Sequence, residues 1–230
     1  MIFYGGTFDP PHLGHRDCVE LAHSTFPDSS MVILPTCESP TPKGFGCKRP
    51  QADFDHRVAM CRLNFESLGI KNLSFDLIER HLSKPNYTAQ TLDALSKSYP
   101  KKKLSFMLGQ DQVENFHLWH NPTLILQTCS LLICRRFSLD KNAHVEVDLP
   151  SCVEGMLERL HLKLTWNSAG SAFIPQTGSS VFLLDRETSP AASRVIRTKL
   201  QQGLPIPEEW LHPLVAAYIR KNKLYKAAAS

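Results

Sequence analysis

Apolar residues alternate along the chain between short runs and longer stretches with helical spacing. The short runs predict buried strands at residues 1–4, 31–34, 73–78, 104–108, 131–134 and 181–184. The helical spacing predicts helices at 13–26, 53–68, 88–98 and 152–161, and a helical stretch broken by a proline between 110 and 127. Strands that alternate with helices are typical of an α/β protein, so we expect a doubly wound parallel sheet with helices on both faces.

The C-terminal part of the chain predicts two further helices. Ser189 and Pro190 form a typical N-cap and first-turn pair for a helix that runs to about residue 202, and Pro207 or Glu208 begins a last helix that ends near 223. Residues 138–180 have the weakest pattern. We interpret the chain as a single domain (1–230) with a sheet core at 1–188, an irregular excursion at about 138–180, and a helical C-terminal segment at 189–226.

Composition narrows the class of protein. The chain has 230 residues, of which 42% are hydrophobic and 21% charged, which excludes intrinsic disorder. The seven cysteines are never spaced as C-x-x-C. This spacing favours a protein of the reducing cytoplasm and argues against a structural zinc site. No signal peptide or membrane-spanning stretch is visible, and a net charge of +4 is too small to indicate nucleic-acid binding. We therefore expect a cytoplasmic protein without membrane or nucleic-acid partners, and homo-oligomerisation stays open.

The strongest chemical signal follows the first strand, where residues 5–15 read GGTFDPPHLGH and open the first helix. Gly5 and Gly6 let a ligand approach the backbone, and the free N–H groups of a helix N-terminus favour anions. His12 and His15 lie three residues apart and would face the same anion. This pattern predicts a phosphate site.

Two other interpretations of the histidines are available. Asp9, His12 and His15 are three residues of types that bind zinc, but no fourth ligand or second-shell carboxylate is evident in the sequence. His117 and His120 repeat the H-x-x-H spacing, and there we favour surface histidines.

The string GGTFDPPHLGH resembles the signature of the nucleotidyltransferase superfamily that carries the (T/H)xGH motif. Within it, nearly the whole chain resembles the bacterial nicotinate-nucleotide adenylyltransferases. The matching motifs are Y-T-A-Q-T-L at 87–92, F-M-L-G-Q-D at 106–111, F-x-x-W at 116–119, C-R-R at 134–136 and A-A-S-R-V-I-R at 191–197. The resemblance implies a Rossmann-like fold and the transfer of AMP from ATP to nicotinate mononucleotide, giving deamido-NAD and pyrophosphate.

The resemblance also implies roles for individual residues. His12, His15 and Arg197 would be catalytic, neutralising charge on the ATP phosphates, while Mg²⁺ would be held mainly by the triphosphate with no protein metal ligand. The ATP pocket would comprise Gly5, Gly6, Thr7, Phe8, Lys43, Gly109, Asp111, Ser193, Arg194 and Ile196. The acceptor would contact Tyr87, Thr88, Trp119 and Arg135. From the residues alone, a helix cap is the less favoured alternative for Asp111, whereas Trp119 is equally a core residue.

The chain departs from the family pattern in three places. Ala192 and Arg194 stand where hydroxyl residues are usual, Lys43 lacks the preceding histidine, and 139–180 is longer than expected.

Three competing functions remain. Nucleotidyl transfer to another phosphate ester, such as nicotinamide mononucleotide or phosphopantetheine, is one. A class I aminoacyl-tRNA synthetase would share HLGH but should be longer and carry a K-M-S-K-S-type loop. A non-catalytic nucleotide-binding regulator should have lost His12, His15 or Arg197.

Overall fold

The computed structural model describes residues 1–40, 50–135, 148–168 and 170–226. Within these ranges the chain builds an eight-stranded sheet of order β3-β2-β1-β4-β5-β8-β7-β6. The strands are β1 (Ile2–Gly6), β2 (Met31–Pro35), β3 (Leu73–Phe75), β4 (Ser105–Gly109), β5 (Ser130–Cys134), β6 (Thr165–Trp166), β7 (Ser171–Ile174) and β8 (Ser179–Leu184). Every neighbouring pair from β3 to β8 in this order is parallel, and β7 and β6 continue the sheet antiparallel.

The helices of the described ranges are α1 (Leu13–Thr25), α2 (Phe54–Phe65), α3 (Thr88–Ser98), α4 (Gln110–Val113), α5 (Pro122–Thr128), α6 (Leu149–Arg159), α7 (Ser193–Gln201) and α8 (Pro213–Lys221). Helices α1 to α6 lie between successive strands of the chain, and α7 and α8 follow the last strand. Four short 3₁₀ helices are also described, η1 (Glu66–Leu68), η2 (Ile78–Arg80), η3 (Phe116–Leu118) and η4 (Glu208–Trp210). None of the helices in the described ranges is long and apolar enough to cross a membrane.

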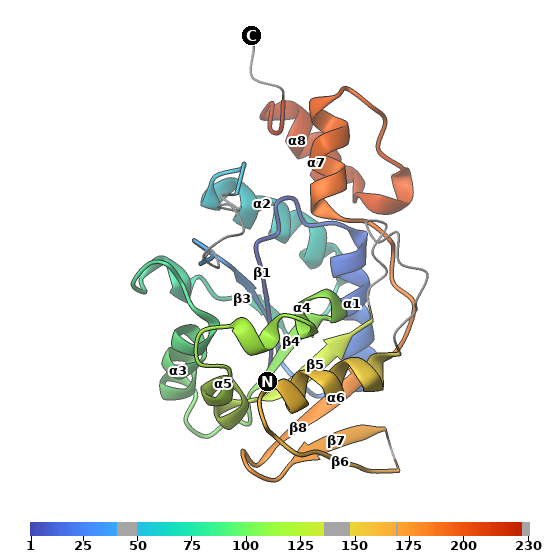
Figure 1. Cartoon of the computed structure of the whole chain (residues 1–230). Helices are drawn as coiled ribbons and strands as arrows, with labels where there is room; N and C mark the ends of the chain where they lie inside the picture. The colour runs from blue at the N-terminus through green and yellow to red at the C-terminus, as the bar shows by residue number, and fades with distance from the viewer. Residues whose placement is uncertain (41–49, 136–147, 169, 227–230) are drawn as a thin grey trace.

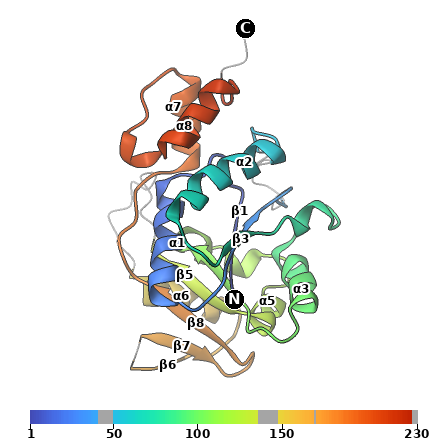
Figure 2. The ribbon, with the colours of Figure 1, turned by 180° about the vertical axis from the view of Figure 1, so that it is seen from behind.

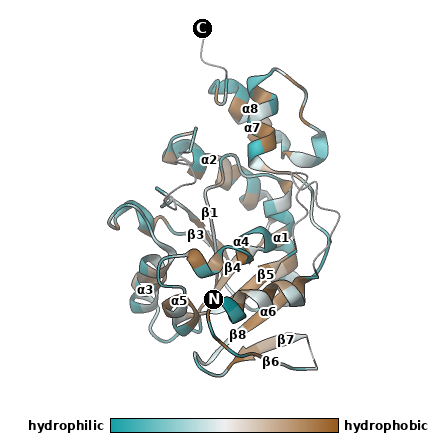
Figure 3. Cartoon of the chain, viewed as in Figure 1, coloured by the Kyte–Doolittle hydropathy of each residue, from teal (hydrophilic) through white to brown (hydrophobic). Residues whose placement is uncertain are grey.

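Alternate residues of each strand enter two different core clusters. Phe3 and Phe106 face the cluster that is closed by α3, α5 and α6, whereas Tyr4 and Met107 face the cluster that is closed by α1 and α2. This period of two places helices on both faces of the sheet, as Figures 1 and 2 show from opposite sides, and hydrophobic colour gathers on the central strands in Figure 3. The predicted doubly wound α/β fold is confirmed.

The C-terminal helices form a unit beyond the carboxyl end of β1. Helices α7 and α8 share a third cluster with α2, in which Met60, Ile196 and Ile219 are buried. In Figures 1 and 2 both helices stand next to α2 and away from the rest of the sheet. This packing brings residues from the two ends of the chain to the same edge of the sheet.

The helix starts in this unit correct the prediction. Helix α7 begins at Ser193 with Ala192 as its N-cap, because the N–H of Ser189 donates to Asp17 at 2.6 Å and its hydroxyl donates to the carbonyl of Glu209 at 3.0 Å. The last helix begins at Pro213 and not at 207 or 208, since a proline suits the first turn of a helix and not its interior.

Residues 148–168 and 170–180 are more regular than the predicted excursion. They hold the expected helix as α6 and then β6 and β7, which extend the sheet from β8 as an antiparallel meander. The strands are short, so their alternation over two and four residues is too brief to stand out in the sequence. This corrects the prediction of irregular structure for the described part of 138–180.

The order of the strands reverses between β1 and β4. The chain moves outward from β1 to β2 and β3, and then crosses back to β4 on the other side of β1. In open α/β sheets, ligands bind where the loops at such a reversal part from one another. Residues 7–12 follow β1 directly and residues 110–111 follow β4 directly, so the predicted site residues among them lie at this reversal.

Candidate active site

The turn after β1 is held by aromatic packing. Phe8 has a φ of 50° and is buried edge-on against Tyr4, His15 and Phe65, with ring centroids 5.5, 5.0 and 5.6 Å away. A Cβ added to Gly6 would lie 2.8 Å from the Phe8 ring. Gly6 is therefore required by the aromatic ring beneath it, a steric reason that does not depend on a phosphate.

His12 and His15 form a stacked pair at the start of α1. Their ring centroids are 3.7 Å apart and the rings are inclined by 34°, and the backbone N–H of His12 donates to Nδ1 of His15 at 3.2 Å. His12 is fully buried and His15 is 8% exposed. Since Nδ1 of His15 accepts a hydrogen bond, the neutral ring carries its proton on Nε2 and presents a donor there.

The carboxylate of Asp9 is occupied by hydrogen-bond donors. Its carboxylate accepts from the backbone N–H groups of Gln51 and Ala52 at 2.8 and 3.1 Å and from the hydroxyl of Tyr225 at 2.7 Å. Among the described residues, no group of three or more histidine, cysteine or acidic side chains is arranged to hold a metal ion. Asp9 therefore organises the loop through its hydrogen bonds.

The second signature of the sequence docks onto the first. Ser193, the first residue of α7, donates its hydroxyl to the carbonyl of Pro10 at 2.9 Å, and Nη1 of Arg197 donates to the carbonyl of Asp9 at 2.6 Å. Nε of Arg197 is buried and, within the described ranges, has no hydrogen-bond partner. The fold thus brings a guanidinium from α7 to the loop that leads into the two histidines.

Arg57 is a central residue that the sequence analysis missed. It is 1% exposed and donates to four backbone carbonyls, those of Thr7, Thr36, Cys37 and Ala52, at 2.6 to 3.1 Å. Burial lowers the pKa of its guanidinium, which the nearby charge of Asp9 partly offsets. Arg57 therefore ties the turn after β1 to the turn after β2. Its one sequence signal is a cation on the buried stripe of α2.

Glu79 connects the turn after β2 to α3. Its carboxylate accepts from the N–H of Cys37 and from the hydroxyl of Thr91, each at 3.0 Å, and it is 7% exposed. Burial raises the pKa of Glu79 to about 7, against the effect of both hydrogen bonds and of the Arg57 charge. Glu79 was also not predicted from the sequence, because a lone glutamate between a strand and a helix looks like an ordinary surface acid.

Three of the four residues predicted for the acceptor lie around the N-terminus of α3 and next to η3, and the fourth, Arg135, follows β5. Tyr87 is the N-cap of α3 and its ring lies 4.4 Å from that of His120, while Thr88 is the first helical residue. Trp119 is partly buried against the core and its ring lies 5.1 Å from Phe116. The structure thus gives Trp119 a packing role.

The other predicted site residues lie on several different elements of the fold. Gly109 is the N-cap of α4, which leaves Asp111 exposed in the first turn and not at the cap. Arg135 forms a two-pronged ion pair with Asp185. In α7, Ile196 is buried in the third cluster whereas Arg194 is exposed. Lys43 lies outside the described residues.

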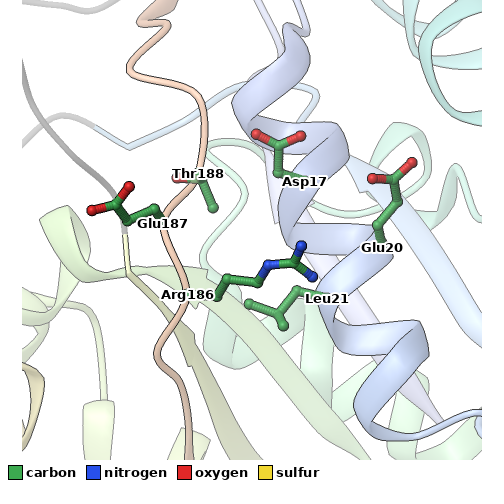
Figure 4. A pocket seen from close by; sticks show the side chains of 6 residues that line it. All are labelled: Asp17, Glu20, Leu21, Arg186, Glu187 and Thr188. Carbon is green, nitrogen blue, oxygen red and sulfur yellow. The ribbon is translucent and has the colours of Figure 1, made fainter.

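Two hollows of the described surface contain none of the predicted site residues. One of about 220 Å³ lies between α1 and the segment after β8, and Figure 4 shows the Arg186 guanidinium extending there towards α1. Its other charged residues are Asp17, Glu20 and Glu187, so an anion would be repelled. The second hollow, of about 460 Å³, lies at the amino-terminal ends of the central strands, beside Ile2, Ser105 and Ser130.

Residues 3–193 match the model of the family described as cytidylyltransferase-like. The chain belongs to this nucleotidyltransferase family. A protein of Klebsiella pneumoniae named probable nicotinate-nucleotide adenylyltransferase is 32% identical over 98% of this chain and 96% of its own length, and one of the same name from Pseudoalteromonas atlantica is 30% identical over 99% and 95%.

A solved structure agrees with the fold. Plasmodium falciparum nicotinic acid mononucleotide adenylyltransferase complexed with NaAD superposes with a TM-score of 0.68 and 19% identity, covering 97% of this chain and 96% of that one. The match to the cytidylyltransferase-like family model ends at Ser193, so Arg197 and Tyr225 lie beyond that match.

Proposed function

We propose that this protein transfers the adenylyl group of ATP to nicotinate mononucleotide and releases pyrophosphate. The observation that carries the proposal is the convergence of His12, His15 and Arg197 on one loop at the strand-order reversal. A stacked imidazole pair at a helix N-terminus, with a guanidinium bonded to the loop that leads into it, suits a triphosphate and suits few neutral ligands. Family membership and the names of the relatives support the same reaction.

The reaction requires positioning more than covalent catalysis. A 5′-phosphate oxygen of the acceptor attacks the α-phosphorus of ATP, and the bond from that phosphorus to the oxygen bridging to the β-phosphate breaks. In this proposal the Nε2–H of His15 donates to the α-phosphate as negative charge develops there. Arg197 holds the leaving pyrophosphate, and its unpartnered buried Nε–H is suited to a phosphate oxygen.

ATP is expected to bind as its magnesium complex, with the ion held by the triphosphate and water. The proposed site offers imidazole and guanidinium donors, and the buried carboxylate of Asp9 is already bonded to N–H and O–H donors. Magnesium prefers oxygen ligands and often keeps several waters, so this donor set fits an ion that arrives with the nucleotide as part of the substrate.

For the acceptor we propose recognition of the ring carboxylate by donors near the N-terminus of α3. Thr88 supplies a hydroxyl and the helix terminus supplies backbone N–H groups with partial positive charge. A carboxamide would place its own N–H₂ against these donors, and no acid lies in residues 87–92 to accept from it. We expect kcat/KM to favour nicotinate over nicotinamide mononucleotide by roughly 10²-fold.

A pyrophosphate-release assay tests the proposal. Purified protein with magnesium and ATP is offered nicotinate mononucleotide, nicotinamide mononucleotide and phosphopantetheine in parallel. We expect fast release with the first acceptor alone. Preference for phosphopantetheine, or release with none of the three while ATP still binds, would refute this function and indicate a different transferase or a nucleotide-binding regulator respectively.

A further inference from the structure

The C-terminal end of the described chain returns to the turn after β1. Tyr225 follows α8, is 6% exposed, and has a φ of 59°. Its ring is part of the third core cluster, and its hydroxyl donates to Oδ1 of Asp9 at 2.7 Å across 216 residues of sequence. A buried contact between a neutral donor and a carboxylate this far apart in the chain links the C-terminal unit to the proposed ATP loop.

The Asp9 carboxylate is hydrogen-bonded to neutral donors, and the charged guanidinium groups of Arg57 and Arg197 lie nearby. Oδ1 accepts from Tyr225 and from the N–H of Ala52, and Oδ2 accepts from the N–H of Gln51. Nη1 of Arg197 lies 3.8 Å from Oδ2, beyond hydrogen-bond distance, and donates to the Asp9 carbonyl instead at 2.6 Å. The neutral donors therefore satisfy the carboxylate without a close pairing to Arg197.

Tyr225 can keep this arrangement at any physiological pH. Burial, together with the Asp9 charge and hydrogen bond, raises the pKa of its hydroxyl well above the usual range, so the group stays a donor. A buried carboxylate that loses such a donor is left undersatisfied and attracts the nearest cation. Arg57 is already held by four backbone carbonyls, so that cation is Arg197, whose side chain would have to turn its donors towards Oδ2 to replace the missing bond.

We propose that Tyr225 is a positioning residue for ATP, which satisfies Asp9 so that the guanidinium of Arg197 stays directed at the triphosphate. The inference rests on the proposed function, because it takes Arg197 to be a phosphate ligand. Tyr225 itself would touch no substrate. The C-terminal segment would thus determine ATP affinity from a position outside the range that matches the family model.

The test is the binding of a non-hydrolysable ATP analogue to Tyr225→Phe, measured by calorimetry with magnesium and without acceptor. We expect the analogue to bind about tenfold more weakly, as for loss of one hydrogen bond to a charged group. In steady-state assays the KM for ATP should rise accordingly while the KM for the acceptor stays unchanged. A general loss of structure would not separate the two KM values in this way.

Tyr218→Phe is the matched control. Tyr218 belongs to the same cluster, and its hydroxyl pairs with Nδ1 of His56 at 2.9 Å, so the variant loses a comparable hydrogen bond away from Asp9. Its analogue affinity should equal that of the wild type. A tenfold loss in this control as well would mean that α8 packing, and not the Asp9 contact, sets the affinity, and would overturn the proposal.

A double-mutant cycle completes the experiment. If Tyr225 acts through Arg197, adding Tyr225→Phe to Arg197→Ala should leave the analogue affinity unchanged. Wild-type affinity in Tyr225→Phe alone, an undiminished tenfold loss in the Arg197→Ala background, or unfolding of Tyr225→Phe would each overturn the proposal. Because no acceptor is present, a failure of the wild type to adenylate nicotinate mononucleotide is a separate result, which refutes the function and not the contact.

Discussion

Glu79→Gln should remove a pH-dependent destabilisation from the native protein. Burial raises the pKa of Glu79 to about 7 from an ordinary 4.5, so between these values the native state holds a proton that the unfolded chain has released. The free energy of unfolding contributed by this group therefore falls as the pH rises from about 4.5 to 7 and is lowest above pH 7. The difference in pKa corresponds to about 3 kcal/mol.

Glutamine can keep the hydrogen bonds while removing the charge. Its carbonyl can accept from the N–H of Cys37 in place of one carboxylate oxygen, and its amide can donate to Oγ1 of Thr91. The Thr91 hydroxyl then has an acceptor in the carbonyl of Tyr87, which lies 3.3 Å away. Glu79→Gln should accordingly exceed the stability of the wild type by less than about 1 kcal/mol at pH 5 and by up to about 3 kcal/mol at pH 8.

Urea unfolding at pH 5, 6, 7 and 8, followed by tryptophan fluorescence, measures this difference. Glu66→Gln is the control, because Glu66 is exposed and pairs with Arg62 four residues earlier at 2.9 Å, so its loss should change stability little at any of these pH values. A constant difference between Glu79→Gln and wild type from pH 5 to pH 8 would show that Glu79 ionises normally, and would refute the argument.

Three further predictions concern the proposed site. Gly14→Ala should lower the free energy of unfolding in urea by about 1–3 kcal/mol, since its Cβ would lie 2.7 Å from the Ser189 carbonyl oxygen. Gly155→Ala is the control, because its Cβ would have nothing within 4 Å, and it should stabilise α6 by up to about 1 kcal/mol. Equal effects of the two substitutions would contradict the contact at Gly14. Arg57→Lys should lower the free energy of unfolding in urea by about 3 kcal/mol, because one ammonium group cannot reach all four carbonyls. An unchanged free energy of unfolding would show that other donors satisfy these carbonyls. His15→Ala should lower kcat by roughly 10² in a protein that remains folded, and a normal kcat would remove His15 from the mechanism.

Local patterns in the sequence were sufficient for much of the fold. The sheet alternates buried residues between its two faces, so each strand of the parallel core is visible as an apolar run, and most helices show their own apolar stripe. The pairing of His12 with His15 is also local, because three residues of helix bring them together. Where an element depended on distant partners the prediction was wrong, as at Ser189, whose N–H is held by Asp17 across 172 residues.

The arrangement around the proposed site was decided by tertiary structure. Arg57 bonds to backbone carbonyls, which every residue has, so no residue type in the sequence marks its partners. Arg135 lay in a motif, and its pairing with Asp185 became visible only when β5 and β8 were neighbours. Tyr225 and Asp9 are 216 residues apart, and only the packing of α8 against α2 closes that distance. Periodicity reports which face a residue occupies, but a contact across the fold depends on where whole elements are placed.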